Sequence, residues 1–416
     1  MFKPKLLNCV LSTIAFSMLS FSCGNSTNSG NNIENTEQEF KEDNQLSKVQ
    51  VKGKSIGDIS MDDAIKAYGK IYEEWYEAGL KRYAKAWETG KLTINGYTMP
   101  LYWRYDSNIT PDDGRALFIS LHGGGGTAAE VNDQQWENQK VLYNPKESDV
   151  YLCPRAITNT WDLHFTEQAD QFYEAIIYMA IVYMDVNPNK VYLMGYSAGG
   201  DGVWRLATRH SDMWAAASMM AGHPGDVSLV NLRNTPFMIW CGAEDEAYNR
   251  NIECAKRIDE MKALHKADPS GYIYSGNIIK NAGHWMNNVD HAAIDWMYQY
   301  TRSPYPNRIV WQQEELTFTR FYWLKVPENE AQRGKRVIAN YDEDNNSITI
   351  QECDYKHLTI LLNDFMLDLD KPIVVNYQGK EIFNGKVSRS KELIKQTLFE
   401  RNDPEFCFYG EINISL

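Results

Sequence analysis

The stretch VYLMGYSAGG, residues 191–200, decides the fold of this 416-residue chain. A short apolar, β-favouring segment runs into Gly-x-Ser-x-Gly, and an apolar pattern with helical spacing follows it. This order predicts a strand, a sharp turn and a helix, with Ser197 held at the turn so that its hydroxyl is exposed. Gly195 and Gly199 lack a Cβ, so strand and helix can pass close together. The turn predicts nucleophilic attack on an acyl carbon, although an ordinary strand–helix loop also explains the pentapeptide taken alone.

A second glycine-rich turn follows the apolar run in FISLHGGGGT, residues 118–127. Backbone N–H groups in such a loop can stabilise the negative oxygen of a tetrahedral intermediate. We expect Gly124 or Gly125 to supply one donor and Ala198 to supply the other. His122 precedes the serine in the chain, so we expect it to brace the loop rather than act in catalysis. A phosphate-binding loop is excluded because no lysine ends the glycine run.

Two later turns carry a candidate acid and a candidate base. The buried-type strand in FMIWCGAED, residues 237–245, ends in Gly-x-x-Asp, which places an acid at the carboxyl end of a strand. Asp245 is the expected partner of the catalytic histidine, and Glu244 is the alternative because either acid can serve. His284 lies in a glycine-containing turn after a further β-like run and is the expected general base. His291, in a helix-like segment, is its competitor.

Together these four motifs, in the order serine, aspartate, histidine, resemble the α/β-hydrolase superfamily over residues 92–300. The chain is similar to its esterase group, which includes feruloyl and acetyl-xylan esterases, polyhydroxybutyrate depolymerases and dienelactone hydrolase relatives, and to the prolyl-oligopeptidase catalytic domain. Segments 159–165, 220–224 and 247–251 resemble a subgroup of secreted hydrolases with a β-rich C-terminal segment. The resemblance implies a mostly parallel α/β sheet with flanking helices and esterase chemistry without a cofactor.

Connections that follow predicted strands supply candidate substrate contacts, because α/β sheets bind ligands at that edge. The candidates are Trp161, His164, His223, Tyr248, Arg250 and Trp285. Trp161 suits a sugar or aromatic face, or packs beneath its own loop. Arg250 can meet an acidic group of the substrate, or tie down a neighbouring Asp or Glu. The remaining histidines have no metal-ligand spacing, so we assign no metal.

The N-terminus resembles an export signal. Two lysines precede an apolar stretch that is too short and too interrupted to span a membrane, so residues 1–22 are expected to be a signal peptide. Cys23 follows a small residue, as at a bacterial lipoprotein cleavage site, although Ser20 stands where leucine is usual. We expect a lipid anchor on Cys23 followed by a polar tether over residues 23–57, with plain secretion as the alternative.

Composition fits two globular domains, with 43% hydrophobic and 23% charged residues. We expect a catalytic domain over residues 58–303, opened by a long amphipathic helix at 60–88. Short β-type runs over residues 304–416 predict an antiparallel β-sandwich. A net charge of −13 argues against binding nucleic acid or anionic membranes, so the lipid anchor is the only membrane contact expected.

These observations predict an exported serine esterase that cleaves carboxylic esters through an acyl-enzyme. Esters linked to carbohydrate or to small aromatic acids are the expected substrates. The 12 Trp and 25 Tyr residues suit stacking on carbohydrate, although many of them must lie in the core. Two alternatives stay open: a serine peptidase of prolyl-oligopeptidase type, and a catalytically weak carbohydrate-binding protein on a hydrolase fold.

Overall fold

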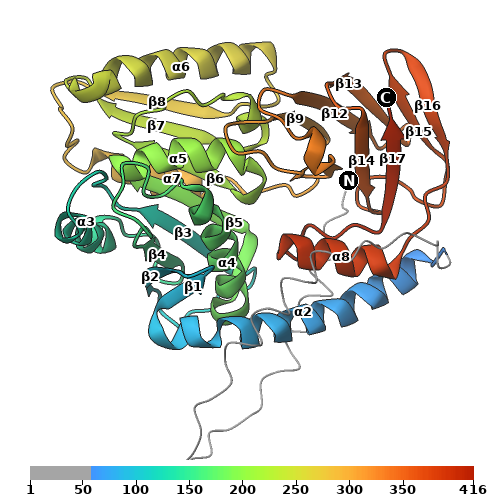
Figure 1. The fold of residues 1–416 in the computed structure, drawn as a ribbon, viewed down its shortest axis with the longest axis horizontal. Helices are drawn as coiled ribbons and strands as arrows, with labels where there is room; N and C mark the ends of the chain where they lie inside the picture. The colour runs from blue at the N-terminus through green and yellow to red at the C-terminus, as the bar shows by residue number, and fades with distance from the viewer. Residues whose placement is uncertain (1–57) are drawn as a thin grey trace, which may run out of the picture.

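The computed structural model describes residues 58–416, so the predicted signal peptide, Cys23 and the tether lie outside the described residues. An eight-stranded sheet has the order β1-β2-β4-β3-β5-β6-β7-β8 (Figure 1). Strands β3 to β8 run parallel, and β1 and β2 are antiparallel, which confirms the predicted mostly parallel sheet. The strands are β1 (Lys91–Ile94), β2 (Tyr97–Arg104), β3 (Arg115–Leu121), β4 (Val150–Pro154), β5 (Val186–Tyr196), β6 (Ala216–Met220), β7 (Phe237–Gly242) and β8 (Tyr274–Ile279).

Helices cover both faces of this sheet, because its central strands are apolar on both sides. In β3 every residue is buried, and alternate side chains enter two different cores. Helices α4, α5 and α6 contribute to one core, whereas α3 and α7 pack on the other. The helices are α3 (Ala129–Leu142), α4 (Glu167–Met184), α5 (Ala198–Arg209), α6 (Arg250–Ala267) and α7 (Ala292–Met297).

The long N-terminal helix, α2 (Met61–Thr89), confirms the predicted amphipathic helix. The Ser60 side chain accepts the Asp63 N–H and caps its first turn, and Gly90 ends it in the left-handed conformation. Trp75 stacks on Tyr178 of α4 with ring centroids 4.3 Å apart. The helix also packs along α8 (Lys391–Arg401), so it connects the eight-stranded sheet to the C-terminal region (Figure 1).

The C-terminal region holds a four-stranded sheet, β10-β11-β14-β17, and a five-stranded sheet, β16-β15-β13-β12-β9. Every strand pair is antiparallel, as predicted, except β13 and β15, which are parallel. Residues 318–326 form two short paired strands rather than one, because Tyr322 between them adopts a positive φ of 49°. The strands are β9 (Arg308–Gln312), β10 (Arg320–Phe321), β11 (Leu324–Lys325), β12 (Arg336–Asp342), β13 (Ser347–Cys353), β14 (His357–Leu362), β15 (Ile373–Tyr377), β16 (Lys380–Gly385) and β17 (Gly410–Ser415).

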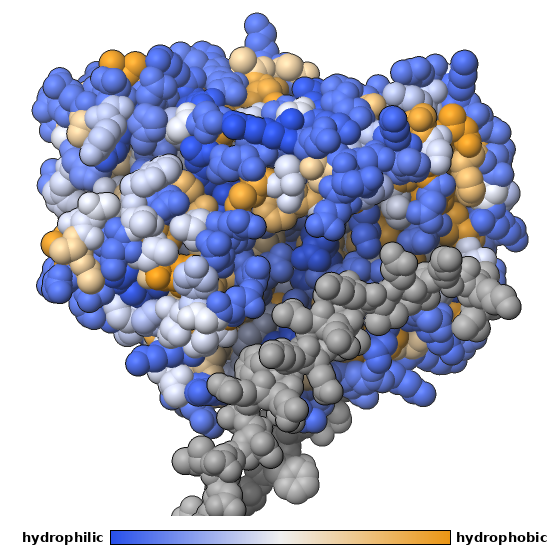
Figure 2. All heavy atoms as spheres, in the orientation of Figure 1, coloured by the Kyte–Doolittle hydropathy of each residue, from blue (hydrophilic) through white to orange (hydrophobic). Residues whose placement is uncertain are grey.

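The face drawn in Figure 2 is largely hydrophilic, with scattered apolar patches. Within residues 58–416, no helix combines the length and the apolar character needed to cross a membrane. The five cysteines of this part of the chain are free thiols, and four of them are buried. They therefore behave as small apolar side chains in the core.

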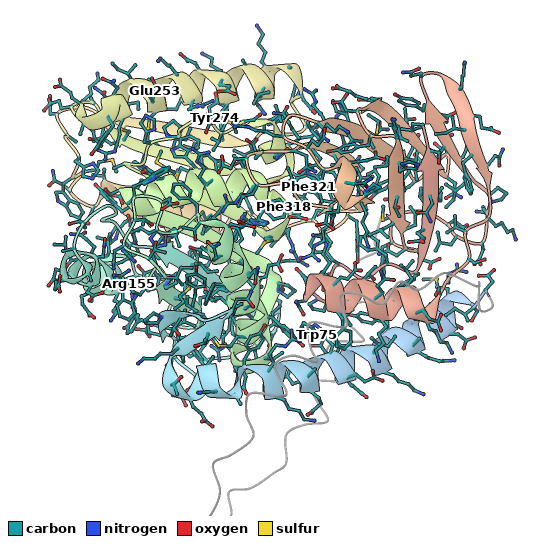
Figure 3. The ribbon with its side chains drawn as sticks, viewed as in Figure 1. Trp75, Arg155, Glu253, Tyr274, Phe318 and Phe321 are labelled. Atoms are coloured by element: carbon teal, nitrogen blue, oxygen red, sulfur yellow. The ribbon has the colours of Figure 1, made fainter. Side chains whose placement is uncertain are left out.

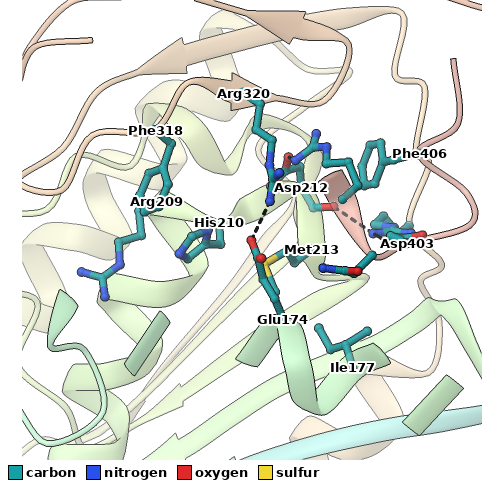
Figure 4. A pocket seen from close by; sticks show the side chains of 13 residues that line it. Glu174, Ile177, Arg209, His210, Asp212, Met213, Phe318, Arg320, Asp403 and Phe406 are labelled. Atoms are coloured by element: carbon teal, nitrogen blue, oxygen red, sulfur yellow. Dashed lines mark hydrogen bonds and ion pairs between the residues drawn. The ribbon is translucent and has the colours of Figure 1, made fainter. Parts of the chain in front are cut away.

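A buried ionic network joins the C-terminal region to the helices of the large sheet. Phe318 and Phe321 lie at this junction (Figure 3), and Phe318 lines a small pocket there. Arg320 pairs with Glu174 of α4 at 3.0 Å (Figure 4). Arg401 of α8 lies 2.8 Å from Asp212, which also accepts the Tyr322 N–H. Burial alone would raise the pKa of Asp212, but Arg401 and the Tyr322 amide outweigh it, so the pKa is lowered.

We predict that Asp212→Asn strongly destabilises the protein, because it leaves the buried Arg401 guanidinium without a counter-charge. The free energy of unfolding, measured by urea denaturation, should fall by about 3–5 kcal/mol. Asp368→Asn, which breaks an exposed pair with Lys371, is the control and should change stability far less. Equal stability of the two variants would contradict a structural role for the junction.

Candidate active site

Ser197 occupies the sharp turn between β5 and α5. Its backbone has φ 59° and ψ −122°, a strained conformation for a residue with a Cβ. A Cβ on Gly195 would lie 2.4 Å from the carbonyl oxygen of Gly199, and a Cβ on Gly199 would lie 2.1 Å from that of Leu121. Neither gap admits a side chain, so the turn requires glycine at both positions. The Ser197 N–H donates to the Met220 carbonyl at 2.9 Å, which fixes the turn against β6.

The structure brings Ser197, His284 and Asp245 together in a chain of hydrogen bonds. His284 Nε2 lies 2.9 Å from Ser197 Oγ, and His284 Nδ1 lies 2.8 Å from Asp245 Oδ2. The Asp245 side chain is 1% exposed, whereas that of His284 is 43% exposed. With Nδ1–H donated to the carboxylate, the lone pair of Nε2 faces the serine hydroxyl. This arrangement can remove the hydroxyl proton during attack on a carbonyl carbon.

The two competing side chains lie elsewhere. Glu244 precedes Asp245 but is exposed, and no hydrogen bond joins it to His284. His291 ends a short 3₁₀ helix and packs against the Tyr143 ring at 5.0 Å. The geometry therefore favours Asp245 and His284 for the roles expected of them.

The glycine loop after β3 places its amides near the serine, but only part of the expected donor set is available. Gly124, Gly125 and Gly126 all have positive φ values, which suit glycine. The Gly125 N–H donates to Asn132 Oδ1 at 2.9 Å, so it is not free for an oxyanion. Within residues 58–416, neither the Gly124 nor the Ala198 amide has an acceptor. We therefore keep Gly124 and Ala198 as the candidate donors and withdraw Gly125.

Asn132, at the start of α3, is a residue that the sequence analysis missed. It is fully buried, and its Nδ2 donates to the Thr127 carbonyl at 3.3 Å and to Asn159 Oδ1 at 3.1 Å. Arg155 binds the same Asn159 oxygen and pairs with Asp133. The polar cluster holds the glycine loop against the connection after β4. A single asparagine in a polar helix carries no sequence signal that distinguishes it from a surface residue.

His122 and His164 lie beneath the glycine loop. The Ala156 N–H donates to His122 Nε2 at 3.1 Å, and His122 Nδ1 lies 2.6 Å from the Gly123 carbonyl. His122 thus braces the loop. His164 was expected to contact substrate, and the structure corrects this expectation. It is fully buried, and its Nε2 donates to the His122 carbonyl at 2.8 Å, so it has no surface to offer a substrate.

We predict that low pH destabilises the protein, because it favours protonation of these two buried histidines. Burial lowers the pKa of His122 to about 4 and that of His164 well below its ordinary value. Each of these neutral histidines contributes to the free energy of unfolding. The contribution is fully present above a pH of about 6.5, which is the pKa of histidine in the unfolded chain, and it is lost as the pH falls below that value. Between pH 7 and 5, His122 alone should lower the free energy of unfolding by about 2 kcal/mol.

The measurement is urea denaturation across this pH range, comparing the wild type with His122→Asn. The variant should show a shallower loss of stability with acid, whatever its stability at pH 7. An unchanged slope in the variant would contradict the assignment of a neutral, buried His122.

Three aromatic side chains rise from the loops around the serine. Trp161, Tyr248 and Trp285 are 65%, 77% and 49% exposed, so all three are available to a ligand. Their roles in substrate binding stay a prediction. His223 is half-buried, and its backbone N–H donates to Asp201 Oδ1 at 2.6 Å, which ties the loop after β6 to α5.

Arg250 lies at the start of α6 and faces the acid of the site. Its Nη1 lies 3.2 Å from Asp245 Oδ1, so of the two interpretations open to it, the structure favours the contact with a neighbouring acid. Within the described residues, no group of three or more His, Cys, Asp or Glu side chains is arranged so that it could hold a metal ion.

Several solved structures are similar to about half of this chain, and they include esterases of the α/β-hydrolase type. A thermostable esterase is 19% identical with a TM-score of 0.40, and the match covers 51% of this chain and 62% of that one. A feruloyl esterase module from Clostridium thermocellum is 16% identical (TM-score 0.35; 50% and 86% covered). A dipeptidyl aminopeptidase IV from Bacteroides ovatus is 11% identical (TM-score 0.37; 51% and 34% covered). No family model matches the sequence, and no curated protein is significantly similar to it.

Proposed function

We propose that this protein is a serine esterase with Ser197 as nucleophile, His284 as general base and Asp245 as the orienting acid. One observation carries the proposal: the unbroken hydrogen-bond chain from Ser197 Oγ through His284 to Asp245 Oδ2. Each role matches the chemistry of its group, because a serine hydroxyl is a weak nucleophile until an adjacent base takes its proton.

The reaction proceeds in two steps. Ser197 Oγ attacks the ester carbonyl while His284 Nε2 takes the hydroxyl proton, and the tetrahedral oxyanion is stabilised by the amides of Gly124 and Ala198. His284 then gives the proton to the departing alcohol, which leaves an acyl group on Ser197. Water, deprotonated by His284, attacks this acyl-enzyme, releases the carboxylic acid and restores the serine.

The substrate class that we propose is an ester carried on carbohydrate, with esters of small aromatic acids as the second class. Two features support it. The catalytic histidine is 43% exposed, so an ester can reach it while attached to a large molecule. Trp161, Tyr248 and Trp285 have exposed rings, which suit the apolar faces of sugars and aromatic acids.

Replacement of the nucleophile tests the enzyme assignment. Ser197→Ala should fold normally and retain less than about one-thousandth of the esterase activity, because the residual catalysis comes from the oxyanion donors alone. A fluorophosphonate should label the wild type at Ser197, as located by mass spectrometry, and should not label the variant. Label on another residue, or wild-type turnover in Ser197→Ala, would remove the assignment.

Removal of the exposed tryptophans tests the substrate class. Trp161→Ala and Trp285→Ala should each lower kcat/KM for an acylated polysaccharide by about fivefold to tenfold, because each lost stacking contact is worth about 1 kcal/mol. Hydrolysis of p-nitrophenyl acetate should stay within about twofold of the wild type. Tyr97→Ala, which removes an exposed aromatic from the start of β2, is the control. Equal losses on both substrates would argue against a carbohydrate platform.

We also propose that the protein is exported and anchored by a lipid on Cys23. The sequence of residues 1–57 supports this, with its apolar signal segment, its cysteine and its polar tether. In the native host, Cys23→Ser should move the protein from the membrane fraction to the soluble fraction, because two or more acyl chains are needed for stable anchoring. Unmodified Cys23 at the mature N-terminus of the wild type would favour plain secretion.

A further inference from the structure

We propose that Arg250 is a positioning residue of the triad, which holds Asp245 and moderates the charge that Asp245 presents to His284. This inference rests on the proposed function, because it concerns the pH range in which His284 can act as a base. It extends the second of the two interpretations that the sequence left open for Arg250, the contact with a neighbouring acid.

The two oxygens of Asp245 have separate partners. Oδ2 lies 2.8 Å from His284 Nδ1, and Oδ1 lies 3.2 Å from Arg250 Nη1. The Arg250 side chain is only 11% exposed, and its Nη1 also lies 3.4 Å from the Ala247 carbonyl. A carboxylate held from both sides cannot rotate, so its Oδ2 stays aimed at the imidazole.

The local backbone is built to place Arg250 there. Tyr248 and Asn249 both have left-handed φ values, 57° and 56°, immediately before α6 begins. Two such residues in succession are costly unless the surrounding structure requires them. Two hydrogen bonds tie this turn to the segment that carries Asp245. The Asn251 N–H donates to the Asp245 carbonyl at 3.1 Å, and Asn251 Nδ2 donates to the Ala243 carbonyl. The Tyr248 ring lies beneath the guanidinium, with its centroid 5.0 Å from Arg250 Cζ.

The charges around His284 give Arg250 an electrostatic effect. Asp245 contacts the imidazole, Asp201 of α5 interacts with it through space, and Arg250 lies on the far side of Asp245. Burial raises the pKa of Asp201, whose carboxylate also interacts with His223 and Arg250. Arg250 is thus a positive group that offsets the acids facing His284. Without it, these acids would stabilise the imidazolium more strongly.

The test uses the full chain with Arg250→Met, Arg250→Gln and Arg250→Lys, and Lys256→Met as the matched control. Lys256 lies on the same helix, and within residues 58–416 its ion pair is with Glu253, three residues before it. The readouts are kcat and KM for p-nitrophenyl acetate from pH 5 to 9 and the rate of fluorophosphonate labelling over the same range.

We expect Arg250→Met to lower kcat about tenfold to a hundredfold with little change in KM, because the acid loses its fixed geometry. The acidic limb of both pH profiles should move up by about half a unit to one unit. Arg250→Gln, which can still donate a hydrogen bond but carries no charge, should keep more of kcat and show the same upward shift. Arg250→Lys should keep the acidic limb of both pH profiles at its wild-type position. Lys256→Met should match the wild type in kcat, KM and both profiles.

An unshifted acidic limb in Arg250→Gln overturns the proposal, and so does a change confined to KM, which would make Arg250 a substrate contact. If Arg250→Met fails to fold, the glutamine and lysine variants still decide. Failure of the proposed function gives a different result, because the wild type itself would then not be labelled at Ser197.

Discussion

The steric constraint at Ser197 governs the rest of this active site. A residue with a Cβ holds φ at 59° there, and it can do so only because β5, α5 and the end of β3 meet without side chains at Gly195 and Gly199. The closeness of these three elements puts the hydroxyl at the carboxyl edge of the sheet, with the Ala198 amide beside it. The acid and the base then arrive at the same edge from the loops after β7 and β8, because parallel strands end there.

Each catalytic group is held by a side chain outside the reacting set. Asn132 and Arg155 fix the glycine loop, His122 supports it from below, and Arg250 holds the acid. These supports are buried or half-buried polar groups, and each makes a hydrogen bond or ion pair that holds a part of the site in place.

Most of the large sheet and the identity of Ser197, Asp245 and His284 could be predicted from local motifs, because each motif is a glycine-containing turn after an apolar strand. Their meeting at one edge follows from the parallel order of β5, β7 and β8. The long-range contacts were not predictable. The Gly125 N–H donates to the Asn132 side chain, seven residues away, and His164, which was expected to contact substrate, is buried beneath the glycine loop. In the C-terminal region, helix α8 was not expected among the short β-type runs, and the parallel pairing of β13 with β15 depends on tertiary packing that no local pattern encodes.

If Ser197 is the nucleophile, its hydroxyl faces an oxyanion site formed by the Gly124 and Ala198 amides. A crystal structure of the wild type after reaction with a fluorophosphonate tests this arrangement. We expect phosphorus bonded to Ser197 Oγ, with the phosphonyl oxygen within about 3 Å of the Gly124 and Ala198 amide nitrogens. A phosphonyl oxygen directed to solvent, or an adduct on any other residue, would show that this site is assigned wrongly.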